Sequence, residues 1–230
     1  MSKVDLEVTN LRLVVNAFRN SVVMLGDRGF DISDLLKVTD QQLEKGFEEQ
    51  KLIWKVDHLD DENLECFLVM EDPGIIFRSD NMASAMKNVL SRRTEEKMTH
   101  VILIFTNPKP TYIEKKINQI NRKTDKILKL GLKGQPYLRF QHFSYLEQQT
   151  NKTRHELVPL HVKLTEEQKN KVIERLGLGE NAMEAFPCIL ENDPQARWLG
   201  LRPGDMCMIV RNSPTVGRAK IFRVCIPKPS

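Results

Sequence analysis

An unbroken apolar run from Val101 to Phe105 limits the fold of this chain more than any other segment. A run of this kind suits a strand that is buried on both faces, as strands are in parallel sheets covered by helices. The two prolines of Asn107-Pro-Lys-Pro110 must end the strand in an exposed loop, because proline lacks the amide hydrogen that a sheet ladder uses. The segment therefore predicts a layered domain in which helices cover both faces of a sheet.

Predicted helices and strands alternate around this run. Between Leu11 and Leu25 apolar residues recur every three or four positions, which is typical of an amphipathic helix, and Gly29 fits its end. Thr39 to Gln42 has capping-box spacing and predicts a short helix to about Lys45. Further strands are predicted at 52–59, 66–70 and 136–145, and further helices at 81–93 (apolar face Met82, Ala85, Met86, Val89 and Leu90) and 111–126. The alternation predicts an α/β fold for about the first 145 residues.

The pattern changes after Thr150 to shorter elements. Thr165 to Gln168 is a second capping box, which predicts a helix to Leu176. Asp193 can cap a helix that has Pro194 at its first position. Strands are predicted at 186–190, 206–210 and 219–226, with a turn at 202–205 and a loop at 212–217. We expect an N-terminal domain at 1–148, a linker at 148–154 and a small α+β domain at 154–230.

Positive charge is concentrated in one segment, although the chain carries a formal net charge of only +4. Residues 107–139 contain nine Lys or Arg and two acids. Lysine and arginine bind phosphates by releasing condensed counterions, so this segment is a candidate nucleic-acid surface. A solvated helix face explains the same charge equally well. Few aromatic residues lie in the segment, which argues against stacking on single strands.

The sequence contains no motif that predicts a catalytic or metal centre. Gly177 to Ala182 has the glycine spacing of a dinucleotide-binding turn, but a helix and not a strand precedes it. Glu114-Lys-Lys116 matches the short element of metal-dependent nucleases, but it lies in a predicted helix, where the two residues point to different faces. His155 and His161 lack partner ligands and are expected to be structural. No cofactor or metal is expected.

The cysteines and the hydropathy indicate an intracellular protein, cytosolic or nuclear. No apolar run approaches the ~20 residues that span a bilayer, and no signal peptide is recognised. The cysteines are far apart and lie in apolar surroundings, so we expect buried, reduced thiols and no disulfide. They are Cys66, Cys188, Cys207 and Cys225.

A series of C-terminal motifs resembles the shared fifth subunit of eukaryotic nuclear RNA polymerases, whose C-terminal part corresponds to a small subunit of archaeal RNA polymerase. The motifs, in order, are His155-Glu-Leu-Val-Pro-x-His161, the helix from Thr165, Asp193-Pro-x-Ala-Arg197, Gly200-Leu-x-x-Gly204, Val210-Arg-x-Ser213 and Gly217-Arg218. The N-terminal part matches more loosely, at Arg19 to Phe30 and at Pro110-Thr111. The resemblance is strong in the last third of the chain and moderate before it.

The resemblance implies a nuclear, non-catalytic subunit of DNA-directed RNA polymerase. The N-terminal jaw-like domain is then expected beside downstream duplex DNA, making weak phosphate contacts, and the C-terminal domain is expected to dock on the largest subunit. The DNA-facing residues would be Lys109, Pro110, Thr111, Lys115 and Lys116. The assembly surface would use or be supported by His155, Glu156, Leu157, Val158, Pro159, Asp193, Arg197, Arg211, Gly217 and Arg218. Among these, the arginines suit direct contacts, whereas Asp193 and Gly217 suit roles within the domain.

The chain also departs from the family pattern, and other interpretations stay open. Phe186 to Leu190 loses a charge, and Ser213 to Ala219 loses an acid and an aromatic residue. These changes fit a copy dedicated to polymerase I, II or III as well as a shared one. A metal-dependent nuclease would use Glu114 and Lys116 with Asp57 or Asp72. A free-standing DNA-binding protein would use the basic segment alone.

Overall fold

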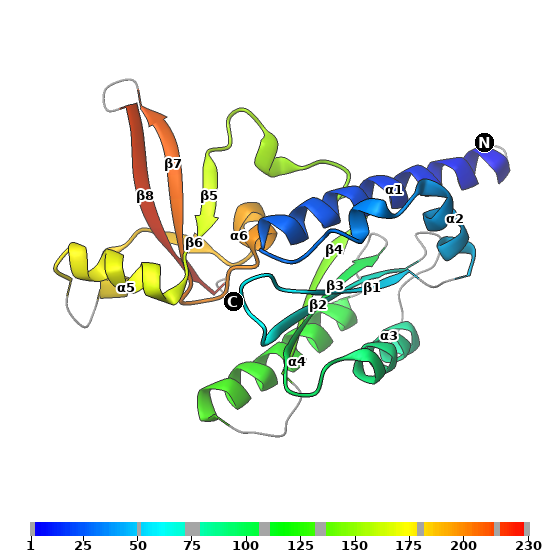
Figure 1. Ribbon diagram of the computed structural model, residues 1–230, viewed down its shortest axis with the longest axis horizontal. Helices are drawn as coiled ribbons and strands as arrows, with labels where there is room; N and C mark the ends of the chain where they lie inside the picture. Colours follow the sequence, from blue (N-terminus) through cyan, green and yellow to red (C-terminus); the bar gives the residue numbers. More distant parts are fainter. Residues whose placement is uncertain are drawn as a thin grey trace. The chain divides into compact units, whose positions relative to one another are not determined.

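The computed structural model describes residues 3–49, 52–71, 79–105, 111–131, 137–178, 182–213 and 217–227. The chain forms two compact units, Met1–Thr150 and Asn151–Ser230, which we call the N-terminal and C-terminal units. The structure is mixed α and β, as expected, with one four-stranded sheet in each unit (Figure 1). Within the described ranges, no helix combines the length and the apolar character needed to cross a bilayer.

The N-terminal unit is built on a mixed sheet with the strand order β1-β2-β3-β4. β1 pairs antiparallel with β2, whereas β2, β3 and β4 are parallel. The strands are β1 (Ile53–Asp57), β2 (Leu64–Met70), β3 (Met98–Phe105) and β4 (Leu138–Ser144), and the helices are α1 (Lys3–Asp27), η1 (Leu35–Lys37), α2 (Asp40–Glu48), α3 (Ser79–Arg92) and α4 (Thr111–Leu130). The α/β prediction for this part of the chain is confirmed. The loop predicted at 107–110 lies outside the described residues.

Helices cover both faces of this sheet. α3 and α4 lie on one face, where Phe67, Val101 and Leu103 of the strands pack against Met82 and Ile117. α1 lies on the opposite face (Figure 1). Leu90, which was predicted on the apolar face of its helix, is 42% exposed, because it lies at the edge of the packed stripe. The β2 and β3 side chains are thus buried alternately on the two faces, as the apolar run predicts.

The end of α1 is fixed by a histidine from a distant turn. Gly29 follows the helix with φ 87°, and the imidazole of His58 lies directly against it. His58 Nδ1 accepts hydrogen bonds from the backbone amides of Asp60 and Asp61, so Nε2 carries the proton and donates to Arg28 O at 3.0 Å. The ring therefore connects the end of α1 to the turn between β1 and β2.

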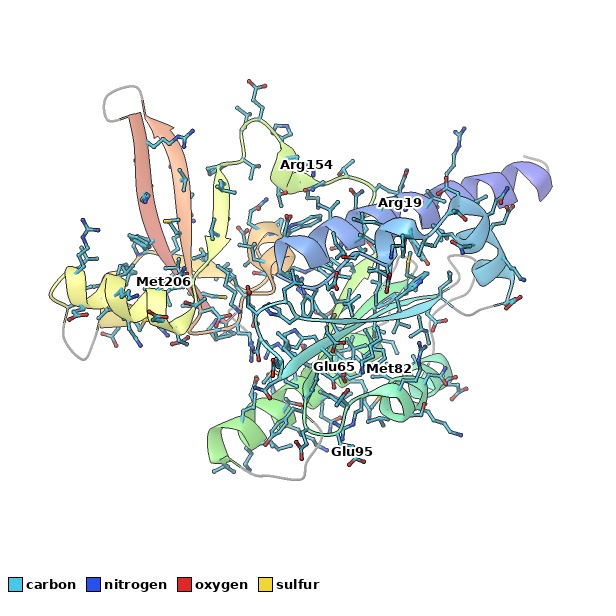
Figure 2. All side chains as sticks on the ribbon, in the orientation of Figure 1. Arg19, Glu65, Met82, Glu95, Arg154 and Met206 are labelled. Carbon is cyan, nitrogen blue, oxygen red and sulfur yellow. The ribbon has the colours of Figure 1, made fainter. Side chains whose placement is uncertain are left out.

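The C-terminal unit has a four-stranded sheet in the order β5-β7-β8-β6. Its elements are η2 (Lys152–Arg154), β5 (Leu160–Lys163), α5 (Glu166–Arg175), η3 (Ala182–Ala185), β6 (Cys188–Leu190), α6 (Pro194–Leu199), β7 (Met206–Ser213) and β8 (Gly217–Ile226). Met206 lies at the base of the long β7–β8 hairpin (Figure 2). It belongs to a core with Leu164, Phe186 and Val224, against which Val172 and Ile173 of α5 pack.

Capping motifs and turn residues predicted most of this unit. The elements that differ from the prediction are those whose extent depends on strand pairing. Thr165 caps α5 in a complete capping box, and Asp193 caps α6. The loop predicted at 212–217 is shorter, because Asn212 pairs with Arg218 and Ser213 with Gly217. The boundary between the two units, after Thr150, lies within the predicted linker 148–154. The carbonyl of Gln148 accepts a hydrogen bond from Asn20, and residues 152–154 form η2. β5 was not predicted.

Three of the cysteines are buried, as expected, but Cys188 is exposed. It lies in β6, where Ile189 takes the buried side of the strand and its two neighbours face outward. Burial raises the pKa of the Cys66 and Cys225 thiols to about 12 and that of Cys207 to about 11.

Substitution of Gly29 tests the contact with His58. A Cβ at residue 29 would lie 2.7 Å from His58 Nε2, whereas a Cβ at Gly131, which also has positive φ, would meet no atom within 4 Å. We expect Gly131→Ala to cost about 1 kcal/mol from backbone strain alone, and Gly29→Ala to cost a further ~1–3 kcal/mol from overpacking. Urea unfolding measures the free energy of unfolding of each variant. The contact would be unimportant if the two variants lost equal stability, or if His58→Ala did not restore stability to Gly29→Ala.

Thiol labelling tests the placement of the cysteines. At pH 8 the three buried thiols are protonated and shielded, since their pKa values are raised, so a chromogenic thiol reagent should modify only Cys188 of the folded chain. After unfolding in guanidinium all four cysteines should react. Rapid labelling of a second thiol in the folded state would contradict the described packing, and Cys188→Ser should abolish the fast phase.

Candidate DNA-facing and assembly surfaces

α4 is fastened to the strand beside it by side-chain hydrogen bonds. Asn121 Nδ2 donates to Phe140 O, and its Oδ1 accepts from the Phe140 amide, both at 2.8 Å. The Thr124 hydroxyl, which is buried, donates to Leu138 O. With Ile113 and Ile117 buried in the core, these bonds fix the rotation of α4 on the sheet. The outward face of the helix is therefore determined.

The outward face of α4 is basic and polar. It forms a shallow depression lined by Lys115, Asn118, Gln119, Arg122, Lys123 and Lys126, which we call the α4 stripe. Its four cations are exposed. Among the described residues, none forms an ion pair with them. The stripe can therefore offer its charges to an external anion.

The structure separates the residues that the sequence predicted as DNA-facing. Lys109 and Pro110 lie outside the described residues, and Thr111 begins α4. Lys115 and Lys116 are both exposed. At about 100° per residue Lys116 lies on the flank of the helix, whereas Lys115 belongs to the stripe. Arg122, Lys123 and Lys126 belong to the predicted basic segment but were not named as DNA-facing. Their helical spacing from Lys115 and Gln119 could have shown that they share one face.

The residues of the nuclease alternative are not brought together. Glu114 and Lys116 lie on different sides of α4, as the helix prediction required. Asp57, in β1, accepts an ion pair from Lys97 at 2.9 Å, and this contact raises the pKa of the lysine ammonium. Asp72 lies outside the described residues. In the described part of the chain no group of three His, Cys, Asp or Glu side chains is placed to hold a metal.

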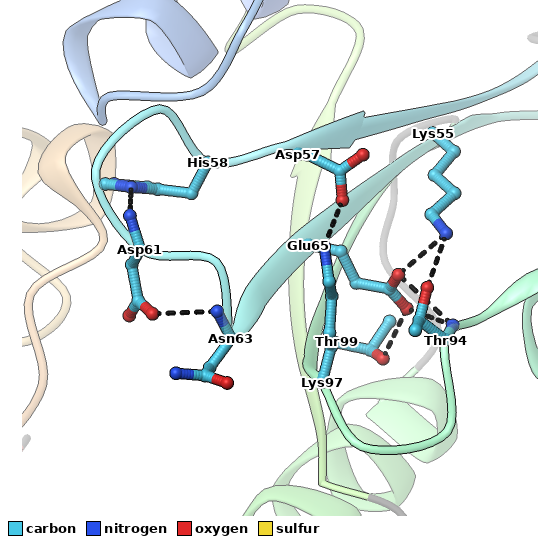
Figure 3. A network of polar contacts seen from close by, with 9 residues as sticks. All are labelled: Lys55, Asp57, His58, Asp61, Asn63, Glu65, Thr94, Lys97 and Thr99. Carbon is cyan, nitrogen blue, oxygen red and sulfur yellow. Dashed lines mark hydrogen bonds and ion pairs between the residues drawn. The ribbon is translucent and has the colours of Figure 1, made fainter.

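The most buried carboxylate, Glu65, belongs to a structural network (Figure 3). Its side chain is fully buried and lies 2.8 Å from Lys55 Nζ. It also accepts hydrogen bonds from the Thr94 amide and the Thr99 hydroxyl. A buried charge needs such compensation. Because its oxygens are occupied by three partners that connect β1, β2, β3 and the end of α3, Glu65 stabilises the sheet.

In the C-terminal unit, a tight turn before β5 presents an apolar side chain to solvent. The Val158 amide donates to His155 O at 2.9 Å, and His155 Nδ1 accepts from the Leu157 amide at 3.2 Å. Leu157, at the tip, is 84% exposed, and Glu156 is exposed beside it. His161 is half-buried and its Nδ1 contacts the carbonyl of Pro159, so both histidines have structural contacts, as expected.

The residues around α6 make contacts within the chain. Asp193 accepts a hydrogen bond from the Gln195 amide at 2.8 Å, and Gly200 ends the helix with φ 65°. Arg197 is half-buried and has partners within the chain. Capping by Asp193 was predicted from its position before Pro194.

The hairpin arginines lie on opposite faces of the sheet. Arg211 pairs with Ala219, and Arg218 pairs with Asn212, the next position in the ladder. Because successive residues of a strand point to opposite faces, the two exposed guanidinium groups project in opposite directions. Gly217 has φ 74° and open space around it, so it is needed for backbone conformation. The sequence had grouped these residues as one surface.

A comparison with protein families matches most of the C-terminal unit. The family model of the RNA polymerase Rpb5 C-terminal domain matches residues 150–225. The DNA-directed RNA polymerase subunit Rpo5 of Thermofilum pendens is 44% identical over 70 residues, which are 30% of this chain and 84% of that subunit. The DNA-directed RNA polymerases I, II, and III subunit of Dictyostelium discoideum is 40% identical over 86 residues (37% of this chain), and that of Caenorhabditis elegans is 38% identical over 91 residues (40% of this chain).

The match spans 42% of the length of each of these two eukaryotic subunits, but most of the archaeal one. An identity of 44% across 84% of the Thermofilum subunit is sufficient to assign the family. This chain belongs to the Rpb5 family of DNA-directed RNA polymerase subunits.

Proposed function

We propose that the chain is a non-catalytic subunit of nuclear RNA polymerase in which the C-terminal unit docks on the largest subunit. One observation carries this proposal. The region that matches the Rpb5 C-terminal domain, residues 150–225, nearly coincides with the C-terminal unit, residues 151–230. An archaeal relative, 84% of whose length is matched by 70 residues of this chain, is itself named a polymerase subunit. The matched length is close to the size of the C-terminal unit, and membership of the enzyme complex is the simplest function that the two proteins can share.

Docking would use the rim of the C-terminal unit. The turn at 155–159 presents Leu157, and β5 presents Leu160, which is 62% exposed. Exposed apolar side chains beside a charged residue, here Glu156, are typical of protein interfaces with a polar rim. Arg218 and Arg211 would contact different partner elements, since they lie on opposite faces of the hairpin. Asp193, Arg197 and Gly217 support the shape of the unit.

The N-terminal unit would form a jaw beside downstream duplex DNA. Lys115 and Lys116 at the start of α4, together with Lys109, Pro110 and Thr111 before them, would position DNA phosphates. Contacts of this kind are independent of sequence and weaken with salt. The chain would have no active site of its own. The absence of a metal-ligand cluster among the described residues gives the nuclease alternative no support.

Affinity purification of the tagged chain tests the assembly proposal. The full chain should recover the largest polymerase subunit, identified by mass spectrometry, and Leu157→Asp should reduce its recovery by about tenfold, a modest effect for an interface anchor. Leu59→Asp is the matched control, because Leu59 is 67% exposed but lies in the N-terminal unit.

The proposal fails if no large polymerase subunit copurifies with the wild-type chain. Equal losses from the two leucine variants would place the docking surface elsewhere. The polymerase that is recovered would also show whether the chain serves one of the three nuclear enzymes or all of them.

A further inference from the structure

We infer that the α4 stripe is a binding site for a run of phosphates of double-stranded DNA. This inference rests on the proposal that the N-terminal unit faces DNA. It moves the main contact from the loop before α4 onto the helix itself and adds Arg122, Lys123 and Lys126. None of these three residues is needed for the assembly proposal.

The basic and acidic side chains of α4 lie on different sides of the helix. At about 100° per residue the six stripe residues fall within roughly 140° of one another. This arc is centred opposite the buried residues Ile113, Ile117 and Thr124. The two acids of the helix, Glu114 and Asp125, lie together on one flank, and Asp125 is paired with Arg139 at 2.9 Å. The stripe therefore presents positive charge with no carboxylate among its residues.

The stripe is pre-organised by the sheet beneath it. The hydrogen bonds of Asn121 and Thr124 to β4 hold the helix from the side opposite the stripe. A partner that binds the stripe would not need to order or rotate the helix. The conformational cost of binding is then limited to immobilising the exposed side chains.

The length of the stripe fits a series of phosphates. From Lys115 to Lys126 the helix rises about 16 Å, at about 1.5 Å per residue. One DNA strand carries a charge about every 3.4 Å along the axis, but successive phosphates wind around the duplex, so a straight helix of this length can meet only a few of them. Asn118 and Gln119 lie among the cations, and side-chain amides are common donors to phosphate oxygens.

The composition of the stripe favours duplex DNA over other polyanionic partners. Single strands are held by stacking on aromatic side chains, and there is no aromatic residue between Ile113 and Leu130. A protein partner with an acidic surface would need apolar anchors at the centre of the interface, and the stripe contains none. The stripe offers only positive charges and amide donors, and these groups suit the phosphate backbone of a duplex.

The test compares two triple variants of the full-length chain. Lys115→Gln/Lys123→Gln/Lys126→Gln removes three stripe charges, and Lys37→Gln/Lys45→Gln/Lys87→Gln removes three exposed lysines of the same unit outside the stripe. Lysine and glutamine have similar helix propensities, so folding should persist, as circular dichroism would verify. Fluorescence anisotropy with a short labelled DNA duplex is measured between about 50 and 200 mM salt.

The wild-type chain should bind weakly, with a log–log salt slope that the stripe variant reduces by about 2–3 and the control by less than about 1. Lys→Arg changes at the same three stripe positions should keep the wild-type slope. The inference is overturned if the two triple variants behave alike, if the wild-type chain does not bind duplex DNA at the lowest salt, or if it prefers single-stranded DNA, duplex RNA or an acidic peptide.

Copurification separates this outcome from the assembly proposal. The stripe variant should recover the largest polymerase subunit as well as the wild type does, because the stripe is in the N-terminal unit. Loss of DNA binding with intact copurification supports both proposals. Intact DNA binding in the stripe variant, with intact copurification, overturns only the stripe.

Discussion

Burial of β2 and β3 on both faces is the constraint on which the N-terminal unit depends. Their side chains alternate between two cores, so helices must cover both sides of the sheet. α1 covers one face, and α3 and α4 cover the other. Each helix then has one apolar side against the sheet and one polar side in water. The basic face of α4 points outward because its opposite face packs against the sheet. Asn121 and Thr124 fix that orientation with hydrogen bonds to the β4 backbone.

The C-terminal unit follows a different principle, because its helices are too short to cover a whole sheet. α5 packs on the base of the β7–β8 hairpin, where Met206 and Val224 are buried. Farther along the hairpin the side chains of Val210 and Phe222 are only half-buried. A module of this kind leaves apolar surface at its rim, which agrees with the proposal that it assembles with a larger protein. It also agrees with the comparisons, in which the model of the Rpb5 C-terminal domain matches residues 150–225.

Local signals predicted the elements well, and pairing accounts for most of the errors. The capping boxes at Thr39 and Thr165 and the cap at Asp193 appear in the structure as hydrogen bonds. These motifs act within a few residues, so their outcome does not depend on distant contacts. β5 was missed because four residues carry little pattern, and its strand conformation comes from pairing with β7. Cys188 was predicted to be buried from its apolar neighbours, but the register of β6 turns it outward.

Sequence alone was sufficient to predict the family, the α/β character of the first part of the chain and the segment that carries the positive charge. Motif order, apolar periodicity and composition are properties of the chain that need no coordinates. The direction in which these charges point depends on packing. The hydrogen bonds to β4 turn the basic face of α4 to solvent, and the strand register directs Arg211 and Arg218 to opposite faces of one hairpin. The physical reason is that the direction of a side chain depends on helix rotation and strand register, which are set by packing against residues far away in the sequence.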